Sequence, residues 1–189
     1  MKEFSIISYF DNETTKEICN LQKEISEITG SSGAFKNWIP HITVGSGIQV
    51  EDSELNKLFE EINSFVENIN LIEIKIKDFY FMDDWVGSKL GLSPYVVSIQ
   101  PYEYEELNIL VNFFENNIKQ KYRVWYEQSL PYNPHITIAY ADLKKESFEK
   151  AKEYLKDRKF EKTIILDNVC LAIKDNEGKW QEYKRFKIN

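Results

Sequence analysis

Hydrophobic residues recur with two different periods along the first half of the chain. Apolar positions three and four residues apart predict amphipathic helices, and alternation of apolar with polar residues predicts half-buried strands. The turn residues TGSSG at 29–33 mark the end of the first helix. The first half therefore reads as strand, helix, helix and strand, over residues 4–10, 18–28, 55–69 and 72–77.

The second half repeats this order after a turn-rich junction at 83–95. Its strand, helix, helix and strand are predicted over residues 95–100, 107–118, 148–155 and 162–174. The sequence DNEG at 175–178 predicts a hairpin turn into a last strand over 179–188. The agreement between the halves predicts an internal duplication within one domain of residues 1–189. Its approximate lobes are residues 1–85 and 93–189, and strands can be exchanged between them.

Both histidines of the chain lie in the same tetrapeptide, Pro-His-Ile-Thr, once in each half. In a strand, successive side chains point to opposite faces. His41 and Thr43 then share one face, and His135 and Thr137 do the same in the second copy. Two lobes related by an approximate two-fold axis would bring these two pairs face to face.

A pair of facing histidines is suited to proton transfer near neutral pH. One neutral imidazole can act as a base and one imidazolium as an acid, while the threonine hydroxyls donate to an oxyanion. A phosphodiester fits this arrangement, because its cleavage removes one proton from the attacking hydroxyl and delivers one to the leaving oxygen. A histidine in a strand is more often structural, and common ancestry alone would repeat a motif. Common ancestry does not readily explain why only the polar tetrapeptide stays identical, so we predict a catalytic pair.

Other chemistries find less support in the motifs. The sequence has no CxxC, HExxH, GxGxxG or Walker A pattern, so we expect no metal site and no cofactor. Cys19 and Cys170 lie away from both tetrapeptides and are expected to be buried and reduced. The GSG sequence at 45–47 is read as a turn that ends the first motif strand.

The charge and hydropathy of the chain limit its partners. The formal net charge is -7, whereas a protein that grips a long duplex usually presents a broad basic face. The composition favours a small or short anionic ligand. No apolar run is long enough to cross a membrane, and the N-terminus lacks the pattern of a signal peptide. We expect a cytoplasmic monomer.

The sequences HITV at 41–44 and HITI at 135–138 make the whole chain resemble the 2H phosphoesterase superfamily. Its 2′-5′ RNA ligase-like and RNA cyclic phosphodiesterase branch is the most similar. The resemblance implies an α+β, bilobal, duplicated fold in which two antiparallel sheets flank a central cleft and helices lie outside. It also implies metal-independent cleavage at a 2′-linked or 2′,3′-cyclic phosphate of a nucleotide or short oligonucleotide. His41 and His135 would be the acid–base pair, and Thr43 and Thr137 would hold the phosphate oxygens.

One residue departs from the pattern of the RNA-processing relatives. Many of them carry a basic residue shortly after the second motif, where HITIAY has Tyr140. Trp38, Tyr132 and Tyr140 are candidates for stacking on a base, although each alone is more often a packing residue. Lys36 and Arg123 are candidate phosphate contacts, with solvated surface charge as the default reading.

Two alternative functions use the same sequence features. The first is reversible 2′-5′ RNA ligation by the same histidines. The second is a nucleotide- or RNA-binding module without catalysis, which the intact histidines and threonines disfavour. Removal of a signalling oligonucleotide in stress or defence would be the same chemistry in another biological role.

Overall fold

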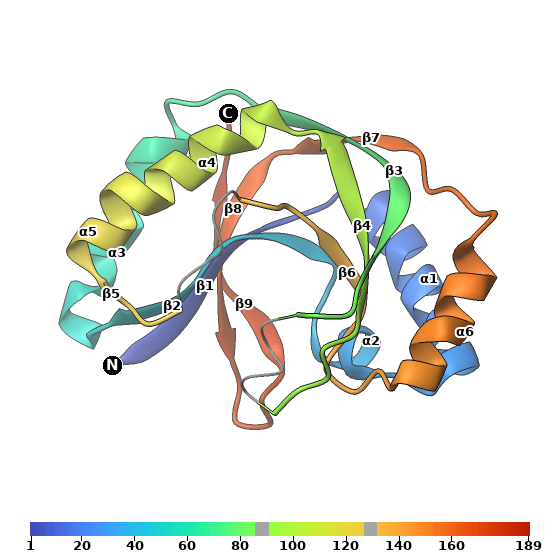
Figure 1. Cartoon of the computed structure of the whole chain (residues 1–189). Coiled ribbons are helices and arrows are strands. Elements are labelled where there is room, and N and C mark those ends of the chain that lie inside the picture. The colour runs from blue at the N-terminus through green and yellow to red at the C-terminus, as the bar shows by residue number, and fades with distance from the viewer. Residues whose placement is uncertain (86–90, 127–131) are drawn as a thin grey trace.

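Two antiparallel sheets form the centre of the computed structural model, which describes residues 1–85, 91–126 and 132–189 (Figure 1). The five-stranded sheet has the order β5-β2-β1-β8-β9, and the four-stranded sheet has the order β6-β4-β3-β7. The first sheet contains β1 (Lys2–Tyr9), β2 (His41–Val50), β5 (Arg123–Val124), β8 (Asn168–Lys174) and β9 (Trp180–Lys187). The second contains β3 (Ile72–Met82), β4 (Val96–Glu103), β6 (Ile136–Ala139) and β7 (Lys162–Leu166).

The helices lie outside the sheets in two groups (Figure 1). One group is α1 (Asn12–Thr29), α2 (Gly33–Asn37) and α6 (Lys145–Leu155), which contact strands of the four-stranded sheet. The other is α3 (Leu55–Val66), α4 (Asn108–Phe113), the π-helical turn Phe114–Ile118 and α5 (Lys119–Lys121), which lie beside the five-stranded sheet. Within the described residues, the helices are too short or too polar to span a bilayer.

Apart from the additional edge strand β5, strands are exchanged between the halves in a similar way in the two sheets. In each sheet the strand that carries the Ile-Thr of one motif, β2 or β6, pairs with the first strand of the same half, β1 or β4. That first strand pairs on its other side with a strand from the other half of the chain. Thus β8 from the second half pairs with β1, and β3 from the first half pairs with β4. The approximate lobes 1–85 and 93–189 therefore do not coincide with the sheets, each of which draws on both.

Most predicted elements are present, and the differences have physical causes. The strand predicted over 162–174 is two strands, β7 and β8, which lie in different sheets and meet at Asp167. Both are apolar, so periodicity does not show where the chain crosses between sheets. The short elements α2 and β5 were not predicted, because they contain too few residues for a period to register. Residues 86–90 of the predicted junction lie outside the described residues.

The prediction that GSG ends the first motif strand was wrong, because β2 continues through it to Val50. Gly45 lies against the ring of Phe114, where an added Cβ would come within 2.4 Å of the ring. Gly47 has a φ of +73°, and an added Cβ would lie 2.8 Å from Tyr126. These glycines let two neighbouring segments approach the strand closely. Both cysteines are free, Cys170 buried and Cys19 only partly so.

Candidate functional site

The two Pro-His-Ile-Thr segments meet at one cleft of about 430 Å³. Both histidines and both threonines line it, while Ile42 and Ile136 are fully buried on the opposite side of their strands. The register holds each motif in place, because Thr43 pairs with Ile7 of β1 and Thr137 pairs with Ser98 of β4. The alternation of side chains expected from the sequence thus places the four polar residues around a common space.

Each imidazole is oriented in the same way by its own backbone. The Nδ1 atom of His41 lies 2.7 Å from the carbonyl oxygen of Ile39, and that of His135 lies 3.0 Å from the carbonyl oxygen of Asn133. A carbonyl only accepts, so in both rings Nδ1 carries the proton and donates it to a residue just ahead of the proline. In the neutral rings Nε2 is then unprotonated and available for proton transfer.

The electrostatics of the cleft favour neutral imidazoles. Burial is the main cause that lowers the pKa of His41 to about 4. The nearby His135 also lowers this pKa, and the hydrogen bond to the carbonyl of Ile39 raises it in part. Burial also lowers the pKa of His135. In the cleft without a ligand, the pKa values of both imidazoles therefore lie below the ordinary histidine value from which the sequence argument started. An anion held between the rings would shift both equilibria toward imidazolium.

Trp38 is sandwiched between two rings. It stacks on His41 with centroids 3.8 Å apart and on Trp180 with centroids 4.3 Å apart. Two nearly parallel rings this close to one indole cannot share a face, so both faces of Trp38 are covered. The stack continues to Lys174, whose Nζ lies 5.1 Å from the centroid of Trp180. Trp38 lines the cleft, but a base cannot stack on it without displacing one of these rings.

Tyr132 also differs from its expected place. It is buried in the core, and its hydroxyl donates a 2.8 Å hydrogen bond to the carbonyl oxygen of Thr43. Burial raises the pKa of its phenol. Tyr132 therefore braces the first motif strand instead of presenting a face to a ligand. Gln22 of α1 has a similar role at the other strand, where its amide donates to the carbonyl oxygen of Thr137 at 2.9 Å.

Tyr140 lines the cleft, whereas the two candidate cations do not. The ring of Tyr140 meets that of Trp85 edge-to-face, with centroids 5.9 Å apart. Burial and the nearby Asp142 raise the pKa of Tyr140. Lys36 and Arg123 are both exposed and lie outside the residues that line the cleft. Among the described residues, the lysine that lines the cleft is Lys174, which the sequence did not indicate.

Most of the aromatic lining of the cleft was not predicted from the sequence. The chain has 4 tryptophans, and all of them line it: Trp38, Trp85, Trp125 and Trp180. They come from four separate segments, so no local spacing connects them. A usable signal was the placement of Trp85 in the polar stretch DDWVG, where a large apolar residue has no helical or strand period to explain it.

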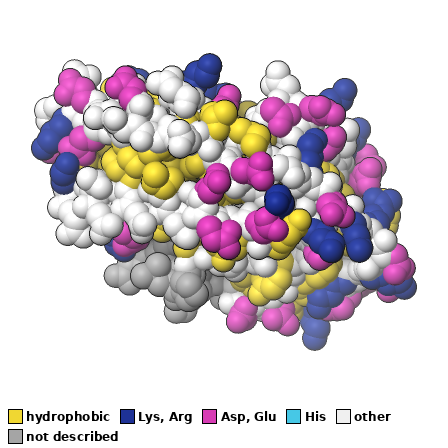
Figure 2. All heavy atoms as spheres, turned by 90° about the horizontal axis from the view of Figure 1, so that it is seen from above, with side chains coloured by type: hydrophobic (Ala, Val, Ile, Leu, Met, Phe, Trp, Pro, Cys, Tyr) yellow, Lys and Arg dark blue, Asp and Glu magenta, His cyan; other side chains and the backbone are white. Residues whose placement is uncertain are grey.

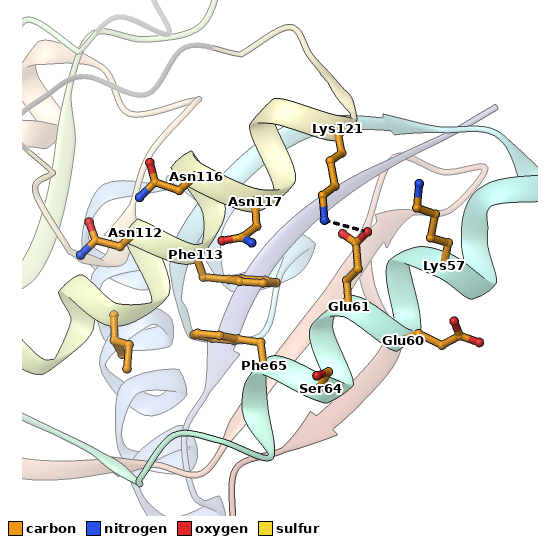
Figure 3. A pocket seen from close by; sticks show the side chains of 11 residues that line it. Lys57, Glu60, Glu61, Ser64, Phe65, Asn112, Phe113, Asn116, Asn117 and Lys121 are labelled. Carbon is orange, nitrogen blue, oxygen red and sulfur yellow. Dashed lines mark hydrogen bonds and ion pairs between the residues drawn. The ribbon is translucent and has the colours of Figure 1, made fainter.

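A second hollow, between α3 and the α4–α5 segment, has none of these features (Figure 3). Its floor is the stacked pair Phe65 and Phe113, with centroids 4.0 Å apart, which joins the two helices. Lys121 pairs with Glu61 across it at 3.1 Å. Neither histidine lines this hollow, so it lacks the paired imidazoles of the cleft.

The charges over the face shown in Figure 2 are mixed. Figure 2 shows acidic and basic side chains interspersed over one face, without an extended basic stripe among its described residues. In the described parts of the chain, no group of three or more His, Cys, Asp or Glu side chains is placed to hold a metal ion.

The fold and cleft define a duplicated, two-sheet protein with paired histidines between its sheets. The chain belongs to the 2′-5′ RNA ligase superfamily, whose family model matches residues 17–178. No curated protein matches the sequence significantly.

Solved structures show the same fold at low sequence identity. TT0787 of Thermus thermophilus aligns with a TM-score of 0.66 at 12% identity, over 98% of this chain and 97% of that one. E. coli LigT in complex with 3′-AMP aligns with a TM-score of 0.63 at 13% identity, over 100% of this chain and 98% of that one. A structure described as a phosphoesterase aligns with a TM-score of 0.60 at 13% identity, over 100% and 99% of the two chains. The α+β architecture is thus that of the LigT-like 2H phosphoesterases.

Proposed function

We propose that this protein is a metal-independent phosphodiesterase that acts on a 2′-linked or 2′,3′-cyclic phosphate of a nucleotide or short oligonucleotide. The observation that carries the proposal is the matched pair of imidazoles in one cleft, each with Nδ1 held by the carbonyl two residues earlier. This arrangement leaves two Nε2 atoms for proton transfer and two threonine hydroxyls for the phosphate oxygens. Solved structures of E. coli LigT with 3′-AMP, ATP and NADP⁺ support a nucleotide ligand by analogy.

The chemistry of a cyclic phosphate needs one base and one acid. One histidine takes a proton from water as its oxygen attacks phosphorus, and the other gives a proton to the ribose oxygen as its bond to phosphorus breaks. Thr43 and Thr137 donate to the phosphate oxygens, on which negative charge accumulates. Ligation, which the family description names, would run the equivalent transfer in reverse with the same two residues.

The test is a substrate panel in the presence of EDTA. It contains 2′,3′-cyclic nucleotides, 2′-5′ and 3′-5′ dinucleotides and cyclic dinucleotides, each with the wild-type protein, His41→Ala and His135→Ala. We expect turnover of one class by the wild type and its loss in both variants. Tyr102→Leu, at an exposed aromatic residue outside the cleft, is the control and should keep full activity. Binding of nucleotides without turnover, unaffected by either histidine variant, would instead identify a binding module.

A further inference from the structure

Tyr9, the last residue of β1, lies directly beside His41. The two residues are register partners in adjacent antiparallel strands. Their rings meet edge-to-face, with centroids 6.5 Å apart and an interplanar angle of 79°. Tyr9 is only 3% exposed, so its ring forms part of the wall behind the imidazole. The proposed acid–base chemistry gives this buried ring no role.

The hydroxyl of Tyr9 adjoins the indole N–H of Trp38, the residue that stacks on His41. Burial raises the pKa of the Tyr9 phenol to about 12, and the indole N–H lowers it in part. Both polar atoms are buried, and neither has another hydrogen-bond partner among the described residues. An indole N–H only donates and a phenol oxygen can accept, so the two groups are complementary. Tyr9 thus contacts His41 with its own ring and also through the indole stacked on the imidazole.

Asn168 holds the peptide of Tyr9 from the neighbouring strand β8. Its side-chain oxygen accepts from the Tyr9 N–H at 3.0 Å, and its amide nitrogen donates to the Tyr9 carbonyl oxygen at 2.9 Å. Asn168 is buried and begins β8, where the chain has just crossed from the other sheet. The pairing of β8 with β1 ends at Cys170 and Ile7, so the amide side chain replaces the next ladder bonds. The end of β1 is therefore held on the side away from His41 as well.

The other histidine is supported by different chemistry at the corresponding position of the second half. By the register of β4 and β6, Gln100 lies opposite His135. The amide of Gln100 donates to the side-chain oxygen of Asn133 at 3.0 Å, and the carbonyl of Asn133 accepts from Nδ1 of His135. Gln100 therefore supports its histidine through a polar contact, whereas Tyr9 supports His41 through aromatic rings.

We infer, building on the proposed function, that Tyr9 is a positioning residue for His41 in catalysis. Its hydroxyl accepts the indole N–H of Trp38 and fixes the plane of that ring, while its own ring limits rotation of the imidazole. Asn168 fixes the position of Tyr9 in the sheet. His41 then presents Nε2 to the phosphodiester in one orientation.

The kinetic test uses Tyr9→Phe, which keeps the ring and removes the hydroxyl. The buried indole N–H of Trp38 then has no acceptor, so the indole shifts toward another partner and His41 loses its fixed plane. We expect kcat on the ester class that the substrate panel identifies to fall about threefold to tenfold, the effect of one lost hydrogen bond, with little change in KM. Tyr102→Phe removes a hydroxyl from an exposed ring outside the cleft and should leave both constants unchanged.

A double variant separates positioning from a loss of stability. Trp38→Phe has no N–H to satisfy, so adding it to Tyr9→Phe removes both members of the pair and should restore most of kcat. A merely structural role predicts the opposite, because two independent buried substitutions add their losses. Unchanged kcat in Tyr9→Phe, or a further fall in the double variant, would overturn the inference and leave the proposed function in place.

NMR tests the positioning without turnover. The chain has two histidines, so their Cε1–H signals are assigned with His41→Ala and His135→Ala at about pH 8, above the lowered pKa of both imidazoles. The stacked indole shifts the His41 signal upfield. Tyr9→Phe should move this signal downfield and leave that of His135 in place, whereas Gln100→Leu should move that of His135 alone.

The NMR outcome keeps the inference distinct from the proposed function. An unmoved His41 signal in Tyr9→Phe, or equal movement of both histidine signals, would overturn the inference whatever the activity. Absence of turnover on every ester, together with a shift confined to His41, would instead remove the proposed function and leave Tyr9 as the residue that orients this imidazole.

Discussion

Trp38 and Tyr132 occupy the same position in the two copies, three residues before each histidine, but their side chains do different things. Trp38 stacks on its own histidine, His41, at 3.8 Å. Tyr132 is buried and bonds across to the carbonyl oxygen of Thr43 in the other motif strand. Among the described residues, no aromatic ring stacks on His135. The duplicated motif is therefore symmetric in its histidines and asymmetric in what supports them.

Replacing Trp38 should impair catalysis through His41. In Trp38→Leu the imidazole loses the ring that fixes its plane, and the indole face no longer stabilises its protonated form. We expect kcat to fall about tenfold with little change in KM, because both faces of the indole are covered and its effect is exerted through His41. The pH dependence of kcat should move to lower pH, since the imidazolium is less stable. Steady-state kinetics from pH 4 to 8 check this.

The conservative variant Trp38→Phe separates positioning from a structural effect. Phenylalanine keeps a ring over His41, so it should restore most of kcat and return the pH profile to that of the wild type. If Trp38→Leu lowers stability but leaves both kcat and the pH profile unchanged, the stack has only a packing role.

Removal of the Tyr132 hydroxyl should destabilise the protein. In Tyr132→Phe the carbonyl oxygen of Thr43 loses its side-chain donor, at a buried position. Loss of one partner from a buried hydrogen bond costs about 1–3 kcal/mol, so the free energy of unfolding should fall by roughly that amount. Urea denaturation measures it, with Tyr102→Phe, at an exposed ring, as the matched control. Equal stability of the two variants would mean that the bond contributes little.

The sequence predicted the parts of the site that lie in strands, where side chains alternate between the two faces. Alternation in β2 and β6 placed each histidine beside its threonine and buried the isoleucine between them. Trp38 and Tyr132 precede these strands, where no period governs side-chain direction, so their contacts could not be read from spacing. The same holds for Trp85 and the other cleft tryptophans, which only the exchange of strands brings together.

The parts of the fold that follow a backbone period were also predicted from the sequence, and the pairing of strands was not. Helices with a long apolar stripe, such as α1 and α3, and alternating strands such as β3 were correctly placed. The split of residues 162–174 into β7 and β8 was not, because both pieces are apolar and only their pairing with β3 and β1 distinguishes them. Periodicity reports which face of an element is buried, not which sheet the element joins.

The stability of the protein should decrease as the pH falls below about 6.5. The pKa of His41 is lowered by burial from 6.5 to about 4, so the unfolded chain takes up a proton in this window and the folded protein does not. Stability is therefore complete above the unfolded value and is lost progressively down to the folded one. We expect the Tm of the wild type to drop between pH 6.5 and 4 more than that of His41→Asn.

The comparison with His41→Asn separates the contribution of the His41 imidazole to the pH dependence of stability from that of the carboxylates, which titrate in the same pH range. Asparagine does not titrate, and its amide is a donor in place of Nδ1–H for the carbonyl of Ile39. Differential scanning calorimetry of both proteins across the window gives the difference directly. Parallel curves for the two proteins would show that His41 is not held neutral by the fold.

The pH dependence of catalysis should have an acid-shifted optimum. Catalysis needs one neutral and one protonated histidine, and burial lowers the pKa of both His41 and His135 below the ordinary value. The profile of kcat/KM reports the free enzyme, so its alkaline limit, where the imidazolium is lost, should lie below the ordinary histidine value, and its acid limit should lie near pH 4. These limits belong to the coupled pair and not to either residue alone. The profile of kcat should lie at higher pH, because the bound phosphate anion stabilises the imidazolium. A flat profile from about pH 5 to 9, with the chemical step rate-limiting, would rule out acid–base catalysis by this pair.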